Sequence, residues 1–294
     1  MKRILNLCLL TLVLSASVSI YAQKTDIRLK LKKGDVYLMK TRMNNVVDQD
    51  MMGMKIKVDQ NVTTETVLKV TDVLANGNYI VEQTYKRLAI DMNTNGQKLS
   101  YDTDVEDASS PLALLKNLKD ATIKYELTPK GEISNISGLN ELLTGMNPQQ
   151  AKMVSGIADK DKMASTFSYI PKDKVKPGDT FTKSIKLKEV MGIVVDTKYT
   201  VEKITPAEAV IRLDSDMKFS PSNPVEQNGV SMKMDGTGTQ NGTYLIDMKT
   251  GMPNSAKTTQ DIDMTVSMKN PQTGKDMAIP MKIKSDVDLT VIKK

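Results

Sequence analysis

The chain has 294 residues, of which 39% are hydrophobic and 26% charged, and it contains one cysteine, no tryptophan and no histidine. Without an imidazole group, the protein cannot use a Ser-His-Asp or Cys-His relay, a histidine-ligated zinc ion or a histidine pH switch. The net charge of +6 is modest, and because acidic residues interleave with the lysines and few aromatic residues accompany them, the composition argues against a nucleic-acid partner.

Residues 1–22 have the pattern of a cleaved secretory signal peptide. Two basic residues precede an apolar run, Ile4 to Val18, and Ala22 offers a small residue at the expected cut. The run is too short to predict a membrane span, and Cys8 lies inside it, where it is a poor lipid anchor. We therefore expect a secreted or periplasmic mature chain with no cysteine, no transmembrane segment and a net charge lowered from +6 to +4.

Most of the remaining chain alternates between apolar and polar residues, which is the pattern of one-sided β-strands. From 281 to 291 the odd positions are mostly apolar, and the even positions carry lysine, aspartate and threonine. The segment 56–70 alternates in the same way and is about three times as long as a usual strand. Long strands coil, so a sheet built from them tends to curl. Lysines spaced two apart, such as Lys282 and Lys284, are interpreted as the solvated face of such strands rather than a stripe for phosphate or lipid head groups.

Turn signals separate these strands and indicate an antiparallel meander. Examples are Asn76–Asn78, Asn95–Gly96 and Lys249–Gly251. The apolar positions change from odd to even numbers near Lys86, which predicts a β-bulge there.

Helices are expected only in the middle of the chain, where capping residues precede short apolar patterns. Ser110 opens one such segment, Ser137 precedes a second that Gly145 ends, and Asn147 opens a longer one. The rhythm of one helix after every strand, which parallel α/β folds require, is absent.

The order of several motifs suggests an internal duplication. The segment 33–35, Lys-Gly-Asp, recurs as Pro-Gly-Asp at 177–179, and Tyr125–Gly131 recurs as Tyr244–Gly251, although lysine-rich hairpins also resemble one another through composition alone. We predict a mainly β fold (β-dominated α+β) of two related lobes of long, curled, half-barrel-like antiparallel sheet with a small helical insert. The expected boundaries are a signal peptide at 1–22, a first β-lobe at 23–108, a helical insert with a β-hairpin segment at 109–165 and a second β-lobe at 166–294.

Four features carry a resemblance: the signal ending at 21–23, the Lys-Gly-Asp opening at 33–35, the Met52-Gly53 hairpin and the segment Tyr125–Gly131. Together they resemble an uncharacterised family of secreted Bacteroidetes proteins of about this length, a domain of unknown function, over most of the mature chain. This resemblance implies no activity. More distantly, the order of strands and helices is similar to periplasmic carriers of lipoproteins and lipids, in which a curled half-barrel sheet encloses an apolar cleft. That similarity implies a carrier by fold analogy alone.

The predicted helices are too few to cover the apolar faces of two β-lobes, so another sheet, the curl of the same sheet or a ligand must cover them. Methionine takes many of the apolar strand positions, and its flexible thioether suits a surface that adapts to varied apolar partners. Filling of gaps in a core poor in aromatic residues is the other explanation for these methionines. The candidate ligand-binding residues lie on the apolar faces of three strands and are Ile56, Val58, Val62, Met264, Val266, Met268, Met281 and Ile283.

Two other chemistries have weaker patterns. Met51, Met52 and Met54 are soft ligands suited to Cu(I), but the mature chain has no histidine or cysteine to complete a site. The carboxylates within 102–107 and at 214 and 216 suggest glycoside hydrolysis or calcium binding. The first group lacks the glycine of an EF-hand loop, and the chain has no tryptophan platform for a sugar.

The sequence therefore predicts a secreted or periplasmic binding protein that is not an enzyme, needs no cofactor and has no metal site. Its expected ligand is a lipid, acyl chain or apolar peptide held on a sheet face rich in methionine and aliphatic residues. The alternative is a structural or protein-interaction module of the cell envelope whose lobes are fully packed. The candidate partners are thus an apolar ligand and an envelope protein, with no nucleic acid.

Overall fold

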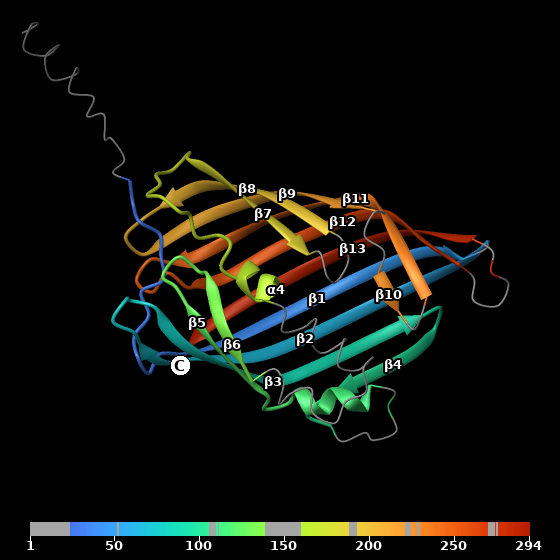
Figure 1. Ribbon diagram of the computed structural model, residues 1–294, viewed down its shortest axis with the longest axis horizontal. Coiled ribbons are helices and arrows are strands. Elements are labelled where there is room, and N and C mark those ends of the chain that lie inside the picture. The colour runs from blue at the N-terminus through green and yellow to red at the C-terminus, as the bar shows by residue number, and fades with distance from the viewer. Residues whose placement is uncertain are drawn as a thin grey trace, which may run out of the picture.

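The computed structural model contains one large antiparallel sheet of thirteen strands (Figure 1), which confirms the predicted mainly β fold. The structure describes residues 24–51, 53–105, 110, 112–138, 160–187, 193–220, 225–227, 230–269, 274 and 276–294. The strands are β1 (Val36–Met51), β2 (Met54–Val73), β3 (Tyr79–Thr94), β4 (Gln97–Asp102), β5 (Thr122–Leu127), β6 (Ile133–Ser137), β7 (Thr180–Leu187), β8 (Ile193–Ile204), β9 (Glu208–Phe219), β10 (Val225–Gln227), β11 (Val230–Asp247), β12 (Pro253–Lys269) and β13 (Asp276–Lys293).

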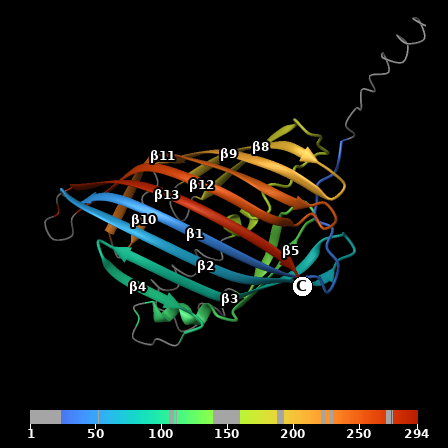
Figure 2. The ribbon, with the colours of Figure 1, turned by 180° about the vertical axis from the view of Figure 1, so that it is seen from behind.

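The strands follow one another across the sheet almost in chain order. The hydrogen-bonded order is β6-β5-β3-β2-β1-β13-β12-β11-β9-β8-β7, with β4 added to β3 and β10 added to β11. Because β13 pairs with β1, the two predicted lobes are two halves of one continuous sheet. The sheet curls so that its edge strands β6 and β7 lie on the same side (Figures 1 and 2), and the short helix α4 (Lys160–Ser165) contacts both.

The two halves share the geometry of the turn that opens each of them. In the turn 32–35, the glycine amide donates to the carbonyl oxygen of Val70, and the Val70 amide donates back to the aspartate carbonyl, at 2.8 and 2.9 Å. The turn 176–179 makes the same two bonds with Val201, at 2.8 and 2.9 Å. In each turn the aspartate carboxylate also accepts the amide of the residue three positions before it. These matching bonds support the internal duplication.

Two segments inside the curl close one end of the sheet. Residues 24–32 cross this end, and their amides donate to the β5–β6 and β11–β12 turns. Residues 166–175 lie beside them, and the buried Tyr169 donates its hydroxyl to the carbonyl oxygen of Gly251 at 2.7 Å. The main hydrophobic core forms between these segments and the inward side chains of the strands. We call this end the closed end, and the opposite end, at the hairpin tip 51–54, the far end.

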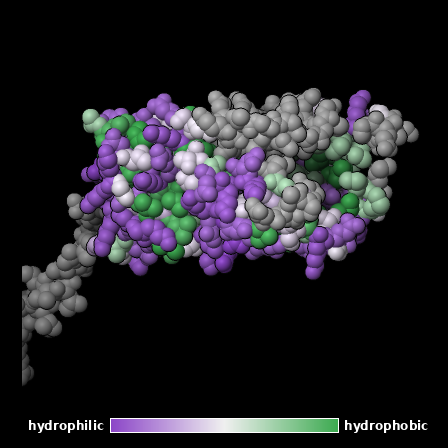
Figure 3. All heavy atoms as spheres, turned by 90° about the horizontal axis from the view of Figure 1, so that it is seen from below, coloured by the Kyte–Doolittle hydropathy of each residue, from purple (hydrophilic) through white to green (hydrophobic). Residues whose placement is uncertain are grey.

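The outward faces of the strands carry charged residues. Lys282 lies 3.1 Å from Asp263, and Lys284 lies 3.8 Å from Asp261, across the β12–β13 pair. All four side chains are exposed, so these lysines occupy the solvated face, as the spacing predicts. Seen from below, the surface is largely hydrophilic, with hydrophobic patches that include a recess towards the far end (Figure 3).

The predicted β-bulge in β3 is confirmed. Tyr85 pairs with Thr66 and Arg87 pairs with Glu65, so Lys86 is the extra residue of the ladder. Because the bulge moves later residues by one position, the apolar side chains on both sides of it face inward.

Glycines on the inner face of β11 allow β11 and β12 to approach each other closely. A Cβ atom at Gly236 would lie 2.5 Å from the Cα atom of Met264, and one at Gly238 would lie 2.8 Å from Cγ1 of Ile262. At Gly236 the two backbones approach too closely for a larger residue, whereas at Gly238 the nearest atom belongs to the Ile262 side chain.

The predicted helical insert is only partly within the described residues. Ser110 accepts the Leu112 amide at 3.2 Å just before the 3-10 helix η1 (Ala113–Leu118), which buries Leu118. Among the described residues, neither η1 nor α4 has the length and apolarity needed to cross a membrane.

Ser137, the expected cap of a second helix, ends β6, because the segment 133–137 pairs with β5 as an edge strand. The helix predicted after it, the segment opened by Asn147 and the predicted signal peptide at 1–22 lie outside the described residues.

Candidate functional site

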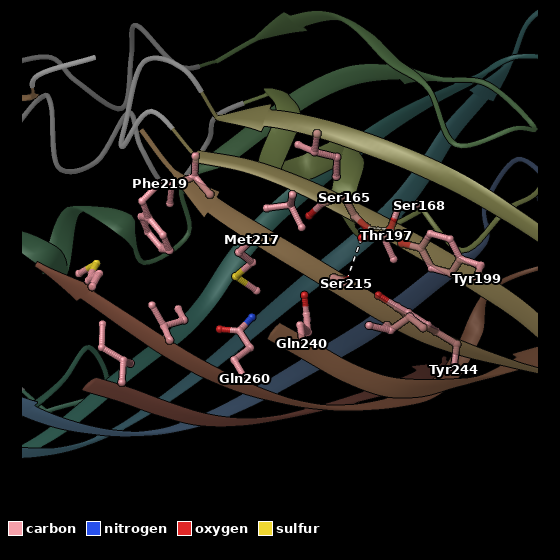
Figure 4. Close-up of a pocket in the computed structure, with 17 residues that line it drawn as sticks. Ser165, Ser168, Thr197, Tyr199, Ser215, Met217, Phe219, Gln240, Tyr244 and Gln260 are labelled. Carbon is pink, nitrogen blue, oxygen red and sulfur yellow. Dashed lines mark hydrogen bonds between the residues drawn. The ribbon is translucent and has the colours of Figure 1, made fainter. Parts of the chain in front are cut away.

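A cavity of about 460 Å³ lies on the inner face of the sheet (Figure 4). It is bounded by strands β7 to β9 and β11 to β13 and by the residues at the end of α4. None of the described residues that line it is charged. Its volume falls in the range of about 300–1,000 Å³ that is typical of sites for one small ligand.

The part of the cavity nearer the far end is apolar. Its side chains are Ile193, Met217, Phe219, Ile262, Met264 and Ile283. The β11 residues opposite Ile262 and Met264 are Gly238 and Gly236. Because these glycines have no side chains, the space above the two β12 residues is not filled from β11.

A row of polar residues crosses the inner face of the sheet in direct register, one residue per strand. Residues directly opposite in antiparallel strands lie on the same face, so the row faces inward throughout. It separates the apolar part of the cavity from the core of the closed end. Its central members are Asn45 of β1, Ser285 of β13, Gln260 of β12, Gln240 of β11, Ser215 of β9 and Thr197 of β8, with Gln60 of β2 and Lys183 of β7 at its two ends.

Four members of this row line the cavity. The hydroxyls of Thr197 and Ser215 hydrogen-bond to each other at 2.8 Å. The side chains of Gln240 and Gln260 point into the cavity (Figure 4), and within the described part of the chain they have no hydrogen-bond partner. The cavity therefore presents two free amide groups next to an apolar surface.

The part of the cavity nearer the closed end is fixed by tyrosine and serine hydroxyls. Tyr199 donates to Oγ of Ser168 at 2.6 Å, and Ser168 donates to the carbonyl oxygen of Ser165 at 2.6 Å. Burial raises the pKa of Tyr199, and the hydrogen bond with Ser168 opposes that rise. The ring of Tyr244 lies 5.0 Å from that of Tyr169, so this wall joins the main core.

The eight predicted ligand-binding residues lie on the inner face but do not form one site. Met264 and Ile283 line the cavity. Ile56 and Met281 line a second hollow of about 490 Å³ near the far end, whose lining includes charged residues. The other four, which line neither hollow, are Val58, Val62, Val266 and Met268.

The sequence prediction named no site residue on β8, β9 or β11, which supply much of the lining. It also missed both glutamines. Gln260 has the same parity as Ile262 in β12, and Gln240 has the same parity as Tyr244 in β11. A polar residue at an apolar position of an alternating strand was the signal that could have identified them.

The structure also places the residues of the two weaker chemistries. Met51 and Met54 pair across the hairpin tip, whereas Met52 lies outside the described residues. Asp102 forms an ion pair with Arg87 at 2.6 Å. Within the described residues, no group of three or more His, Cys, Asp or Glu side chains is placed to hold a metal ion.

Residues 76–253 match a family described as a family of unknown function (DUF6263). The match covers more than half of the sequence. The chain belongs to this family. The DUF6263 match runs from the start of β3 to the start of β12, so it contains Gln240 but not Gln260. A search of curated proteins gives no match.

Three solved structures have a distant similarity to this DUF6263 chain. Lipovitellin, in a structure of its lipid–protein interactions, matches with a TM-score of 0.52 and 11% identity over 90% of this chain, which spans 25% of that protein's length. The outer membrane protein OprG from Pseudomonas aeruginosa matches with a TM-score of 0.25 and 10% identity, over 89% of this chain and 97% of its own. An outer membrane channel from Pseudomonas putida F1 matches with a TM-score of 0.27 and 10% identity, over 90% of this chain and 97% of the channel's own chain. The lipovitellin match establishes a shared sheet architecture.

Proposed function

We propose that this protein is a non-catalytic binding protein that holds one lipid, acyl chain or other apolar ligand in the cavity of its sheet. The observation that carries the proposal is a cavity of about 460 Å³ whose described lining has no charged side chain. Ile262 and Met264 are only partly buried there. Removing such apolar surface from water has a favourable free energy of about 25 cal/mol per Å². The cavity therefore favours an apolar ligand.

The similarity in fold to lipovitellin supports the same proposal by analogy, because lipovitellin is a protein with lipid–protein interactions. The cavity residues themselves belong to this chain, so the choice of ligand rests on them. The signal-peptide pattern of residues 1–22 supports a secreted or periplasmic location. An apolar molecule that crosses an aqueous compartment needs such a cover.

The positions of the carboxylates support binding rather than catalysis. Asp102 is paired with Arg87 at 2.6 Å, and Asp104 is paired with Lys119 at 2.8 Å. These ion pairs join β3, β4 and the end of η1. We therefore assign these carboxylates a role in holding the fold together.

Mass spectrometry of the lipids extracted from the purified protein tests the proposal. We expect one apolar passenger for each chain, and we expect the delipidated protein to take up a pyrene-labelled acyl chain, supplied both as the free acid and as the methyl ester. A protein that is purified empty and takes up neither form contradicts the proposal. The remaining function would then be a structural or interaction module of the cell envelope.

A pair of variants connects binding to this cavity. Met264→Glu puts a charge into the apolar part of the cavity, and we expect it to weaken uptake of the methyl ester by about tenfold or more, because an unpaired buried charge is costly. Ser267→Glu puts the same charge on the exposed outer face of the same strand and should bind like the unchanged protein. Equal binding by both variants would place the ligand elsewhere.

A further inference from the structure

The two cavity glutamines are directly opposite each other on neighbouring strands. Gln240 of β11 pairs with Gln260 of β12 in the ladder, and both side chains enter the cavity (Figure 4). Each amide has a donor and an acceptor, and within the described residues neither amide has a hydrogen-bond partner. Both residues are only partly buried, so their amides are accessible to a polar group of a ligand that enters the cavity.

The surroundings of the two amides are polar on one side and apolar on the other. Ser215 lies opposite Gln240 in the ladder and is bonded to Thr197 at 2.8 Å. Towards the far end, the next inward residue of β12 is Ile262, which faces a glycine of β11. A ligand with its head at the amides thus has room for a hydrocarbon over the apolar residues.

The side chains near Gln240 and Gln260 determine which charge a ligand head group can carry there. Among the described residues, no charged side chain lines the cavity. The nearest charged member of the polar row is Lys183, which pairs with Thr197 but does not line the cavity. Its charged neighbours are Glu132 and Lys130, and burial lowers its pKa. An anionic head at the glutamines would therefore be buried without a paired cation, which is unfavourable.

We propose that the cavity selects an amphiphile with an uncharged, hydrogen-bonding head group, such as a glyceryl ester or a fatty amide. Its head pairs with the amides of Gln240 and Gln260, and its hydrocarbon lies against Phe219, Met264 and Ile283. This inference rests on the proposed binding of an apolar ligand and adds the chemical class of that ligand. The amides both donate and accept, which matches a hydroxyl, ester or amide rather than a carboxylate.

Equilibrium binding of two ligands with the same chain tests this inference. Calorimetry with the delipidated full chain compares monooleoylglycerol with oleate, each below the concentration at which it aggregates. We expect monooleoylglycerol to bind at least about tenfold more tightly, because only the anion has to bury an unpaired charge. Oleate binding as tightly or more tightly would overturn the inference and leave the proposed function in place. Failure of both ligands to bind would overturn the proposed function as well.

Variants assign the head-group contact to the two amides. The double variant Gln240→Leu with Gln260→Leu keeps an apolar lining but removes the hydrogen-bond partners of the head group, so the affinity for monooleoylglycerol should fall by about tenfold. The control, Thr239→Val with Thr259→Val, changes the exposed outer face of the same strands and should keep that affinity. Thermal unfolding of each variant confirms that it is folded. An unchanged affinity for monooleoylglycerol in a folded glutamine variant, or a preference for oleate that disappears in Lys183→Met, would overturn the assignment.

Discussion

Asp35 and Asp179 occupy the same position in the two turns that open the halves of the sheet. Among the described contacts, only Asp35 forms an ion pair with the last strand. Lys293 of β13 lies 2.7 Å from Asp35, and the Tyr37 hydroxyl donates to the same carboxylate at 3.3 Å. The described side-chain contact of Asp179 is the amide of Lys176, at 3.0 Å. The first turn therefore also anchors the last strand, at the place where β13 joins β1.

This difference predicts unequal losses of stability. Asp35 is 11% exposed in its side chain, so Asp35→Asn should lower the free energy of unfolding by about 1–3 kcal/mol near pH 7. Asp179→Asn should lower it by less than about 1 kcal/mol, because it removes no ion pair with any described residue. Urea unfolding of both variants measures the two losses. Equal losses would show that the contact with Lys293 contributes nothing.

The same pair of residues predicts a dependence on pH. Burial raises the pKa of Asp35, but the hydrogen bonds from Lys293 and from the Lys32 amide outweigh it, so the pKa lies below its ordinary value. A carboxylate with a lowered pKa in the folded protein stabilises it above the pKa of the unfolded chain, and this contribution is lost as the pH falls through the folded pKa. The gap in stability between the unchanged protein and Asp35→Asn should therefore narrow as the pH falls below the unfolded value of about 3.9. A gap that stays constant across this acid range would contradict the assignment.

The glycines of β11 predict two different kinds of damage. Gly236→Ala should be strongly destabilising, because its Cβ would lie 2.5 Å from the Cα atom of Met264 and backbone atoms cannot move aside. In Gly238→Ala the nearest atom is Cγ1 of Ile262, which belongs to a side chain. Adding Ile262→Ala should therefore recover part of the loss in Gly238→Ala. Urea unfolding of the double-mutant cycle measures this coupling, which should be at least about 0.5 kcal/mol. Purely additive losses would contradict the predicted clash.

Local features of the fold could be predicted from the sequence, because they depend on consecutive residues. The bulge at Lys86 follows from a change of parity within one strand, and the turns follow from their glycines. The polar row could not be predicted, because it depends on register between distant strands: Asn45 faces Ser285 because the last strand pairs with the first. For the same reason the repeated motifs indicate two related lobes and do not show that the lobes join.

The bulge at Lys86 predicts that deletion and substitution have very different effects. Deleting Lys86 removes the extra residue, so either Tyr85 or Leu88 must turn from the inner face to the outer face. Lys86→Ala removes only an exposed contact with Asp120 and keeps the register. We expect the deletion to lower the midpoint of urea unfolding clearly and the substitution to leave it almost unchanged. Similar midpoints would mean that the strand repacks without the bulge.

Buried tyrosines predict a loss of stability in alkali. Burial raises the pKa of Tyr85 to about 12 in the folded protein, whereas an unfolded tyrosine titrates near pH 10. The neutral hydroxyl therefore stabilises the fold fully below about pH 10, and this contribution is lost as the pH rises through the folded pKa. Tyr85→Phe cannot ionise, so its free energy of unfolding should fall less than that of the unchanged protein between about pH 9 and pH 11.5.

Tyr79 supplies the control for this alkaline prediction. Its hydroxyl donates to the carbonyl oxygen of Leu29 at 3.0 Å, whereas the described residues offer no hydrogen-bond partner to the Tyr85 hydroxyl. Tyr79→Phe should therefore lose about 1 kcal/mol of stability near neutral pH, where Tyr85→Phe should lose little. Urea unfolding across the pH range, with ultraviolet titration of the tyrosines, separates the two effects. If Tyr85→Phe loses stability in parallel with the unchanged protein up to about pH 11.5, the titrating group responsible for alkaline unfolding is not this buried hydroxyl.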